Sequence, residues 1–267
     1  MEIHHYTSIE NLALILKNKT IRFTRLDKVD DSEEAGLSCK NIQLSYYTFV
    51  SCWTDSEEES IPLWKMYAGK EMHGIRISLD SDMFLKYHIP SGRFYGVDEK
   101  SSILPIEKIV TKDYLVVPSF NDSEMFFKKV LYVDNPFSEM RDVVQIQDMG
   151  NGEGAMKMNL KKIGLYKRKC WAFQKEHRFT LTILPNIWGD IDINQMPKRI
   201  MQAVYDRIPP KLSFFDLEIN PELLSKMKIT LSPICSEAEK VIVESIVQKF
   251  APKAIIRESM LKGLINR

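Results

Sequence analysis

Three groups of residues in this chain carry side chains that could bind a ligand. His4 and His5 are adjacent near the N-terminus, Trp64 and Tyr67 are one helical turn apart, and Glu176 stands just before an apolar, β-branched run. Histidine forms hydrogen bonds near neutral pH, an aromatic face allows stacking, and a carboxylate stabilises positive charge. Each group also has an ordinary structural explanation: hydrogen bonding at a strand end, core packing, or a surface ion pair with neighbouring basic residues.

The elements that must position these residues follow from local patterns. A Ser N-cap at Ser8 and apolar spacing from Ile9 onward predict a helix to about Asn18, and Ser60 with Pro62 opens a second, short helix that carries Trp64 and Tyr67. The alternating and β-branched runs predict strands at 3–7, 20–24, 43–53, 74–79, 103–117, 127–133, 177–184, 214–219, 229–232 and 254–257. The chain therefore opens with a β-α-β unit.

Further helices are expected from caps and periodicity. They cover 80–88 after an Asp cap, 159–173, 197–206 and 237–250, the last beginning with a Ser236–Glu239 capping box. The glycine-rich stretch 150–154 is expected to be an exposed loop. The acidic segment 25–41 predicts a polar loop or short surface helix, in which Asp31 and Glu34 act as a loop-stabilising cap.

Composition excludes several functional classes. The chain has 267 residues, 44% hydrophobic and 27% charged, with a formal net charge of +1, which disfavours general nucleic-acid or anionic-membrane binding. No P-loop or GxGxxG motif is present, and the four cysteines lack zinc-ligand spacing. No stretch is apolar enough for a membrane span, and the N-terminus does not read as a secretory signal. A cytoplasmic protein without a metal is therefore expected.

A resemblance to a known family adds to these patterns. The run His4-His5-Tyr6-Thr7-Ser8 is followed by an Asn-x-x-x-Ile-Leu helix at 11–16 and by a second short strand at 21–23. This order resembles the opening of ADP-ribosyltransferases of the His-Tyr-Glu type, which include the poly-ADP-ribose polymerases. The chain as a whole also resembles a bacterial family catalogued as domain of unknown function 2971, at positions 5–8, 30–34, 63–67, 74–75, 176–178 and 229–264. Asp31 and Glu34 lie where that family also carries acids, which implies a contact to an arginine or a metal ion as the alternative to a loop cap.

The resemblance implies an α+β fold and an activity on NAD. An ADP-ribosyltransferase-like core, with a mixed or antiparallel sheet flanked by helices, is expected in residues 1–184, and a C-terminal α/β extension packed on it in residues 185–267. The enzyme would cleave the nicotinamide glycosidic bond of NAD and transfer ADP-ribose to an unknown macromolecular acceptor, as a bacterial toxin or phage-defence effector. Because that bond breaks through a dissociative, oxocarbenium-like transition state, the protein must clamp the ribose, stack the nicotinamide and face the cation with a carboxylate.

The resemblance also assigns roles to the first motif. His5 corresponds to the histidine that hydrogen-bonds a ribose hydroxyl, the Tyr6 backbone to the segment that pairs with the nicotinamide amide, and Thr7 to the small hydroxyl of that motif. Tyr6 stands where the polymerases carry glycine.

The stacking aromatic and the glutamate complete the expected site. Tyr67 ranks first as the stacking residue and Trp64 second. Glu176 corresponds to the glutamate that binds a ribose hydroxyl and stabilises the developing cation, and Gln174 stands two residues before it, as in the Gln-x-Glu pattern of arginine-directed transferases. That short match does not predict arginine as the acceptor.

Two other functions remain open at this level. The first is a catalytically silent nucleotide-binding or sensor module, suggested by Tyr6 in the glycine position. The second is a nucleic-acid-modifying relative, for which the stretch 157–169, with six basic residues out of thirteen, would contact the acceptor or a pyrophosphate. A solvated helix face is the alternative explanation of that stretch.

Overall fold

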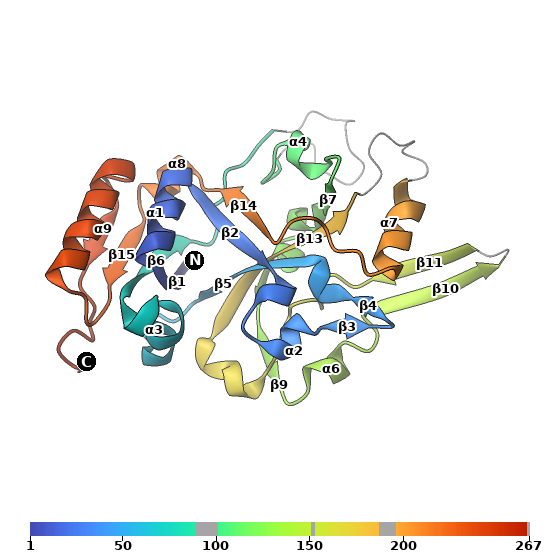
Figure 1. Ribbon diagram of the computed structural model, residues 1–267, viewed down its shortest axis with the longest axis horizontal. Helices are drawn as coiled ribbons and strands as arrows, with labels where there is room; N and C mark the ends of the chain where they lie inside the picture. Colours follow the sequence, from blue (N-terminus) through green and yellow to red (C-terminus); the bar gives the residue numbers. More distant parts are fainter. Residues whose placement is uncertain (89–100, 151–152, 187–195, 266–267) are drawn as a thin grey trace.

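The computed structural model describes residues 1–88, 101–150, 153–186 and 196–265. This part of the chain has a mixed α+β architecture built on one large sheet of ten strands (Figure 1). The strands of the large sheet are β1 (Glu2–Ser8), β2 (Thr20–Arg25), β5 (Thr48–Thr54), β6 (Gly74–Asp80), β7 (Tyr114–Val117), β8 (Phe127–Lys129), β13 (Glu176–Pro185), β14 (Phe214–Glu218), β15 (Lys228–Leu231) and β16 (Ile255–Arg257). All pairs in it are antiparallel except β15 with β16.

Smaller elements surround this sheet. Three two-stranded sheets are formed by β3 (Ser38–Cys39) with β4 (Ile42–Gln43), β9 (Leu131–Val133) with β12 (Tyr166–Arg168), and β10 (Val144–Gly150) with β11 (Glu153–Met158). The α-helices are α1 (Ile9–Asn18), α2 (Ser32–Ala35), α3 (Ile61–Tyr67), α4 (Ile106–Ile109), α5 (Ser123–Phe126), α6 (Pro136–Glu139), α7 (Met196–Tyr205), α8 (Pro221–Leu224) and α9 (Glu237–Phe250). Short 3-10 turns are η1 (Leu26–Lys28), η2 (Leu44–Tyr46), η3 (Lys70–Met72), η4 (Pro118–Asn121) and η5 (Lys169–Gln174).

The predicted caps are confirmed. The Ser8 side chain accepts a hydrogen bond from the backbone N–H of Asn11, and Ser60 caps α3 in the same way. Ser236 and Glu239 form the reciprocal capping box that begins α9. The opening β-α-β unit and the C-terminal helix α9 therefore stand where the sequence predicted them.

The core has two main layers, one on each side of the central strands. The larger hydrophobic cluster gathers aromatic rings from β2, β13 and α5 together with the buried leucines of α1 and the buried valines of α9. In it Phe23, Phe84 and Phe126 pack around Phe179, whose ring centroid lies 4.9 Å from that of Phe84. A second cluster lies around Leu26, with contributions from β5, β10 and α7. Burying this much apolar surface is the main term that holds the sheet together.

Several sequence expectations are wrong in this part of the chain. Residues 80–88 contain no helix: β6 runs to Asp80, and the Asp80 carboxylate accepts a hydrogen bond from the N–H of Asp82, which makes a turn. Residues 159–173 form turns, β12 and η5 instead of one helix, because Gly164 has a φ of 71° that ends helical geometry. The expected strand at 103–117 contains α4 followed by β7.

Other expectations need refinement. The glycine-rich loop expected at 150–154 is the end of the β10–β11 hairpin, which extends away from the body of the protein (Figure 1). Gly150 and Glu153 are paired strand residues of this hairpin, and positions 151–152 lie outside the described residues. The strands of the expected C-terminal extension, β14, β15 and β16, join the same large sheet as the N-terminal strands.

Candidate active site

The central strand β5 has two partners on one of its edges. β13 pairs along the whole length of β5, from Thr48 to Thr54, and so occupies one edge. β2 pairs with β5 only at Phe49 and Val50, and β1 pairs with it only opposite Thr54, so these two strands share the other edge. Between β2 and β1, residues 51–53 of β5 have no partner on this edge among the described strands, although they pair with β13 on the other edge. The sheet thereby divides into a β2–β14 branch and a β1–β6–β15–β16 branch. We call this division the fork.

A cavity of about 450 Å³ lies at the fork. It is lined by residues of β1, β2, β5, α3, β12 and β13 and by the segment 28–34, and its size is that of an ordinary small-molecule site. A second hollow of about 300 Å³ lies beside it, between β1, α1 and β2, and shares His5, Tyr6, Arg22 and Tyr67 with the first. His5, Tyr6, Tyr67 and Glu176, which are far apart in sequence, all line the larger cavity.

His5 is positioned by the open edge of β5. Its Nδ1 lies 2.8 Å from the carbonyl oxygen of Cys52, and because a carbonyl only accepts, Nδ1 carries the proton. Burial lowers the pKa of His5, so the imidazole is neutral and its Nε2 is an acceptor that no hydrogen bond from the described residues engages. The ring also lies 5.2 Å from the ring of Trp53. His5 thus bridges the two strands where their ladder is interrupted and presents one lone pair.

Tyr6 and Thr7 lie on either side of the same strand. The Tyr6 side chain is buried with α3: its hydroxyl accepts a hydrogen bond from the Ser60 N–H at 3.0 Å, and its ring meets that of Trp64 edge-on at 4.9 Å. Thr7 is buried, lines the smaller hollow and accepts a hydrogen bond from the side chain of Asn11. The tyrosine ring in the glycine position is therefore directed largely into packing against α3.

The two aromatic candidates occupy different environments. Trp64 is fully buried, donates its indole N–H to Glu59 at 2.9 Å and does not line the cavity. Tyr67 is half-buried and lines both hollows. Its hydroxyl donates to Asp30 at 2.7 Å and accepts from the Gln174 amide at 2.8 Å. Tyr67 is thus the aromatic residue of α3 that borders the space for a ligand.

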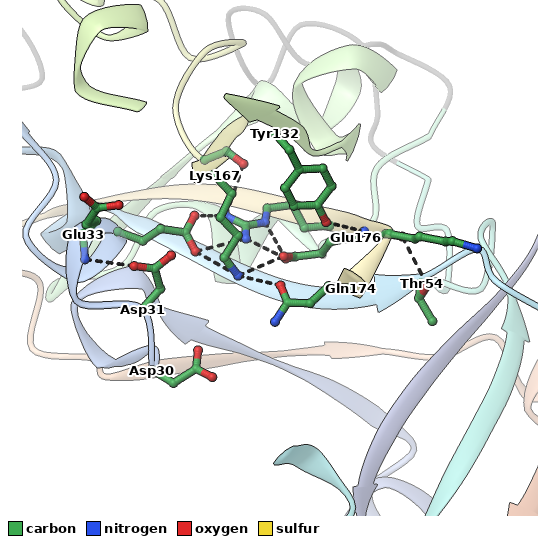
Figure 2. Close-up of polar contacts among 12 residues, drawn as sticks. Asp30, Asp31, Glu33, Thr54, Tyr132, Lys167, Gln174 and Glu176 are labelled. Atoms are coloured by element: carbon green, nitrogen blue, oxygen red, sulfur yellow. Dashed lines mark hydrogen bonds and ion pairs between the residues drawn. The ribbon is translucent and has the colours of Figure 1, made fainter. Parts of the chain in front are cut away.

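Glu176 belongs to a buried cluster of charges (Figure 2), which is not the surface ion pair that its neighbours suggested. One carboxylate oxygen accepts from Arg178 at 2.8 Å and the other from Lys167 at 3.1 Å. Arg178 also forms an ion pair with Glu34 at 2.5 Å, and the Lys167 ammonium lies 3.4 Å from the Glu34 carboxylate. We call Glu34, Lys167, Glu176 and Arg178 the buried charge cluster; it holds two acids and two bases.

The cluster is tied to the neighbouring strands. The backbone N–H of Glu176 donates to the hydroxyl of Tyr132 at 2.8 Å, and the Thr54 hydroxyl donates to the carbonyl of Lys175 (Figure 2). Lys175 itself has a φ of 45°, which turns the chain sharply from η5 into β13. Glu176 is therefore held at the first position of its strand by backbone and side-chain contacts together.

Protonation in the cluster follows from burial and charge. Burial by itself would raise the pKa of Glu176, but the charges of Arg178 and Lys167 outweigh it and hold the pKa below its usual value. The carboxylates likewise raise the pKa of Lys167 despite its burial. Burial, with Glu176 nearby, raises the pKa of the Cys52 thiol well above its normal value, so Cys52 is not a nucleophilic thiolate. Glu176 is an ionised hydrogen-bond acceptor and not a proton donor.

The basic stretch 157–169 is not a stripe on a helix face. Lys161 pairs with Glu124, Arg168 with Glu33, and Lys169 with Asp134. Lys167 is 4% exposed and belongs to the buried charge cluster. Most of these charges are therefore neutralised separately by different acids.

Asp31 and Glu34 divide the roles expected for them. The Asp31 carboxylate caps α2 by accepting from the N–H of Glu33, and Glu34 is the arginine contact. Sequence reasoning named Arg178 only as a surface partner of Glu176 and missed its burial with Glu34, which lies 144 positions away. It missed Lys167 because the segment after it was expected to be helical. The available signals were Gln174 and Arg178, each two residues from Glu176.

Neither a metal centre nor a membrane helix is found in the described ranges. No group of three or more His, Cys, Asp or Glu side chains in them is arranged to hold a metal ion. None of their helices has the length and apolar character needed to cross a bilayer. Comparisons with models of protein families, with curated proteins and with solved structures found no match.

Proposed function

We propose that this protein is an NAD-dependent ADP-ribosyltransferase-like enzyme whose active site is the cavity at the fork. The observation that carries the proposal is convergence: His5, Tyr67 and Glu176, selected from the sequence for this chemistry, border one cavity although 171 positions separate the first from the last. Their meeting at one cavity supports a shared role.

The chemical states of these residues suit the reaction. Neutral His5 offers Nε2 to a ribose hydroxyl, and ionised Glu176 accepts a second hydroxyl near the anomeric carbon. The ring of Tyr67 borders the cavity as a stacking surface for nicotinamide. Departure of nicotinamide creates positive charge on the ribose, and a fixed carboxylate lowers the energy of that state. The free edge of β5 and the diverging part of β1 supply backbone groups for the carboxamide.

The test is release of nicotinamide from NAD by the purified protein, followed by chromatography. Wild type should release nicotinamide, and Glu176→Gln should lose the activity by about a hundredfold or more, as expected when a transition-state contact is removed. Glu124→Gln is the matched control, since Glu124 is an exposed glutamate paired to Lys161 on the surface. Circular dichroism must show that each variant is folded. A Glu176→Gln enzyme with wild-type activity would refute the assignment. Once wild type is shown to release nicotinamide, labelled acceptors separate transfer of ADP-ribose from hydrolysis of NAD.

One observation favours a second candidate, the catalytically silent nucleotide sensor. Both oxygens of Glu176 are engaged by Arg178 and Lys167, whose charges offset the negative charge that the reaction needs. For this candidate, NAD or a related nucleotide raises the melting temperature without any nicotinamide release. Release of nicotinamide by wild type but not by Glu176→Gln excludes this candidate.

A further inference from the structure

A chain of hydrogen bonds connects the aromatic side of the cavity to its acidic side. It runs from Asp30 to the Tyr67 hydroxyl, then through the Gln174 amide to Lys167 and Glu176. The three side-chain hydrogen bonds from Tyr67 to Glu176 measure 2.8, 2.9 and 3.1 Å. Figure 2 shows Lys167 between Gln174 and Glu176.

Gln174 is the link that joins the two sides. It is 5% exposed and ends η5, two residues before Glu176. An ammonium only donates, so the Gln174 carbonyl oxygen faces Lys167 and its NH₂ faces Tyr67, which fixes the orientation of the amide. Both ends of the amide are occupied, so Gln174 is not free to bind a guanidinium group of an acceptor.

Tyr67 needs such a link because of its position. It is the last residue of α3, where the helix ends and backbone hydrogen bonding no longer restrains the chain as it does within a helix. Burial, and then the hydrogen bond to Asp30, raise the pKa of Tyr67, so the phenol stays protonated, donates to Asp30 and accepts from Gln174. Two hydrogen bonds in different directions leave the ring one orientation.

We propose that Gln174 is a positioning residue that couples the orientation of the Tyr67 ring to the place of the Glu176 carboxylate, through Lys167. Removing the amide frees the ring, while the ion pairs of Lys167 and Arg178 with Glu34 and Glu176 do not involve Gln174 and still hold the buried charge cluster. The inference rests on the proposed function only for its kinetic consequence; the orientation of Tyr67 is measured without any substrate.

The first arm of the test places 3-fluorotyrosine at position 67 and records its ¹⁹F NMR signal. In Gln174→Met, which keeps length and loses both hydrogen bonds, the signal should shift or broaden as the ring becomes mobile. Gln43→Met is the matched control, because Gln43 is a half-buried glutamine bonded to Ser45 and Ala35 outside the cavity, and it should leave the signal unchanged. A wild-type signal in Gln174→Met overturns the inference. Should that variant fail to fold, the shorter Gln174→Asn takes its place.

The second arm uses NAD turnover. Gln174→Met and Tyr67→Phe should each lower kcat about tenfold or more with KM changed less than about threefold, since a misplaced stacking group costs transition-state alignment. The double variant should be no slower than either single variant, because both break one link. Wild-type kcat in Gln174→Met overturns the inference and leaves the proposed function intact. If wild type itself does not cleave NAD, the proposed function fails and the ¹⁹F arm alone decides the positioning role.

Discussion

Charge balance in the buried charge cluster makes the sharpest prediction about stability. Glu34→Gln removes one negative charge and keeps nearly the same shape. Its carboxylate lies 2.5 Å from Arg178 and 3.4 Å from Lys167, and all the side chains concerned are at least nine-tenths buried. The variant leaves two cations facing the single carboxylate of Glu176, with no water to stabilise the excess charge.

The expected cost can be set from these contacts. Breaking a buried pair by removing one partner costs about 3 to 5 kcal/mol, because the remaining ion is still desolvated. Adding Lys167→Met removes the surplus cation, so the double variant should recover about 2 kcal/mol relative to Glu34→Gln alone. The same Glu→Gln change at Glu124, whose partner Lys161 is on the surface, should cost less than about 1 kcal/mol.

Urea unfolding at pH 7, followed by tryptophan fluorescence, measures all four proteins. The free energy of unfolding should fall in the order wild type and Glu124→Gln, then Glu34→Gln with Lys167→Met, then Glu34→Gln. If the double variant is no more stable than Glu34→Gln, removing the surplus cation does not relieve the imbalance. The reasoning from charge balance is then wrong.

Three further predictions concern single positions. Burial, with the charge of Arg178 nearby, lowers the pKa of Lys128 to about 7, so between pH 7 and 10 the unfolded chain binds more protons than the folded one. Over this range the free energy of unfolding of wild type, measured with urea, should rise by about 4 kcal/mol relative to that of Lys128→Met. Parallel profiles of unfolding free energy against pH for the two proteins would contradict this. Burial and then Glu34 raise the pKa of Asp31, so ionised Asp31 destabilises the fold at neutral pH. Asp31→Asn, which keeps the cap, should raise the urea midpoint at pH 8, with a gain that shrinks as the pH falls toward about 4; a gain independent of pH would exclude titration as its cause. A Cβ on Gly74 would lie 2.4 Å from the carbonyl oxygen of Ala68, so Gly74→Ala should lower Tm by about 6 to 12 °C. A variant that melts at the wild-type temperature would show that the strand can move away from Ala68.

The sequence predicted the opening β-α-β unit, α3, β13 and α9 because each has a local cause. Ser8, Ser60 and Ser236 cap helices within three residues, and alternation in short runs predicts strands. The helix wrongly predicted at 80–88 has an equally local cause, since an aspartate that accepts from the residue two positions on begins a turn as readily as a helix. At 159–173 the apolar spacing resembled a helix, but the backbone carbonyls of Leu160 and Ile163 accept from Lys128 instead.

The site was predictable only in part for the same reason. His5 and Tyr67 follow a motif order that can be read along the chain, and both border the cavity. Arg178 was visible as a neighbour of Glu176, but the rest of the buried charge cluster could not be read in this way. Arg178 binds Glu34 across 144 positions, and Lys167 enters the site only because the segment before β13 turns back instead of forming a helix. Such pairings depend on the completed sheet and leave no periodic signature.

The fork also dictates when the cavity can exist during synthesis. One side of it comes from β1, and the other comes from β13, which is synthesised later and ends at Pro185. Until β13 pairs along β5, the whole β13-side edge of β5 is unpaired and the charges of Lys167 and Arg178 have no buried partners. A growing chain that ends before β13 thus carries His5 and Tyr67 but no complete site. The proposed activity therefore requires completed long-range pairing, and a fragment that ends before β13 should not show it.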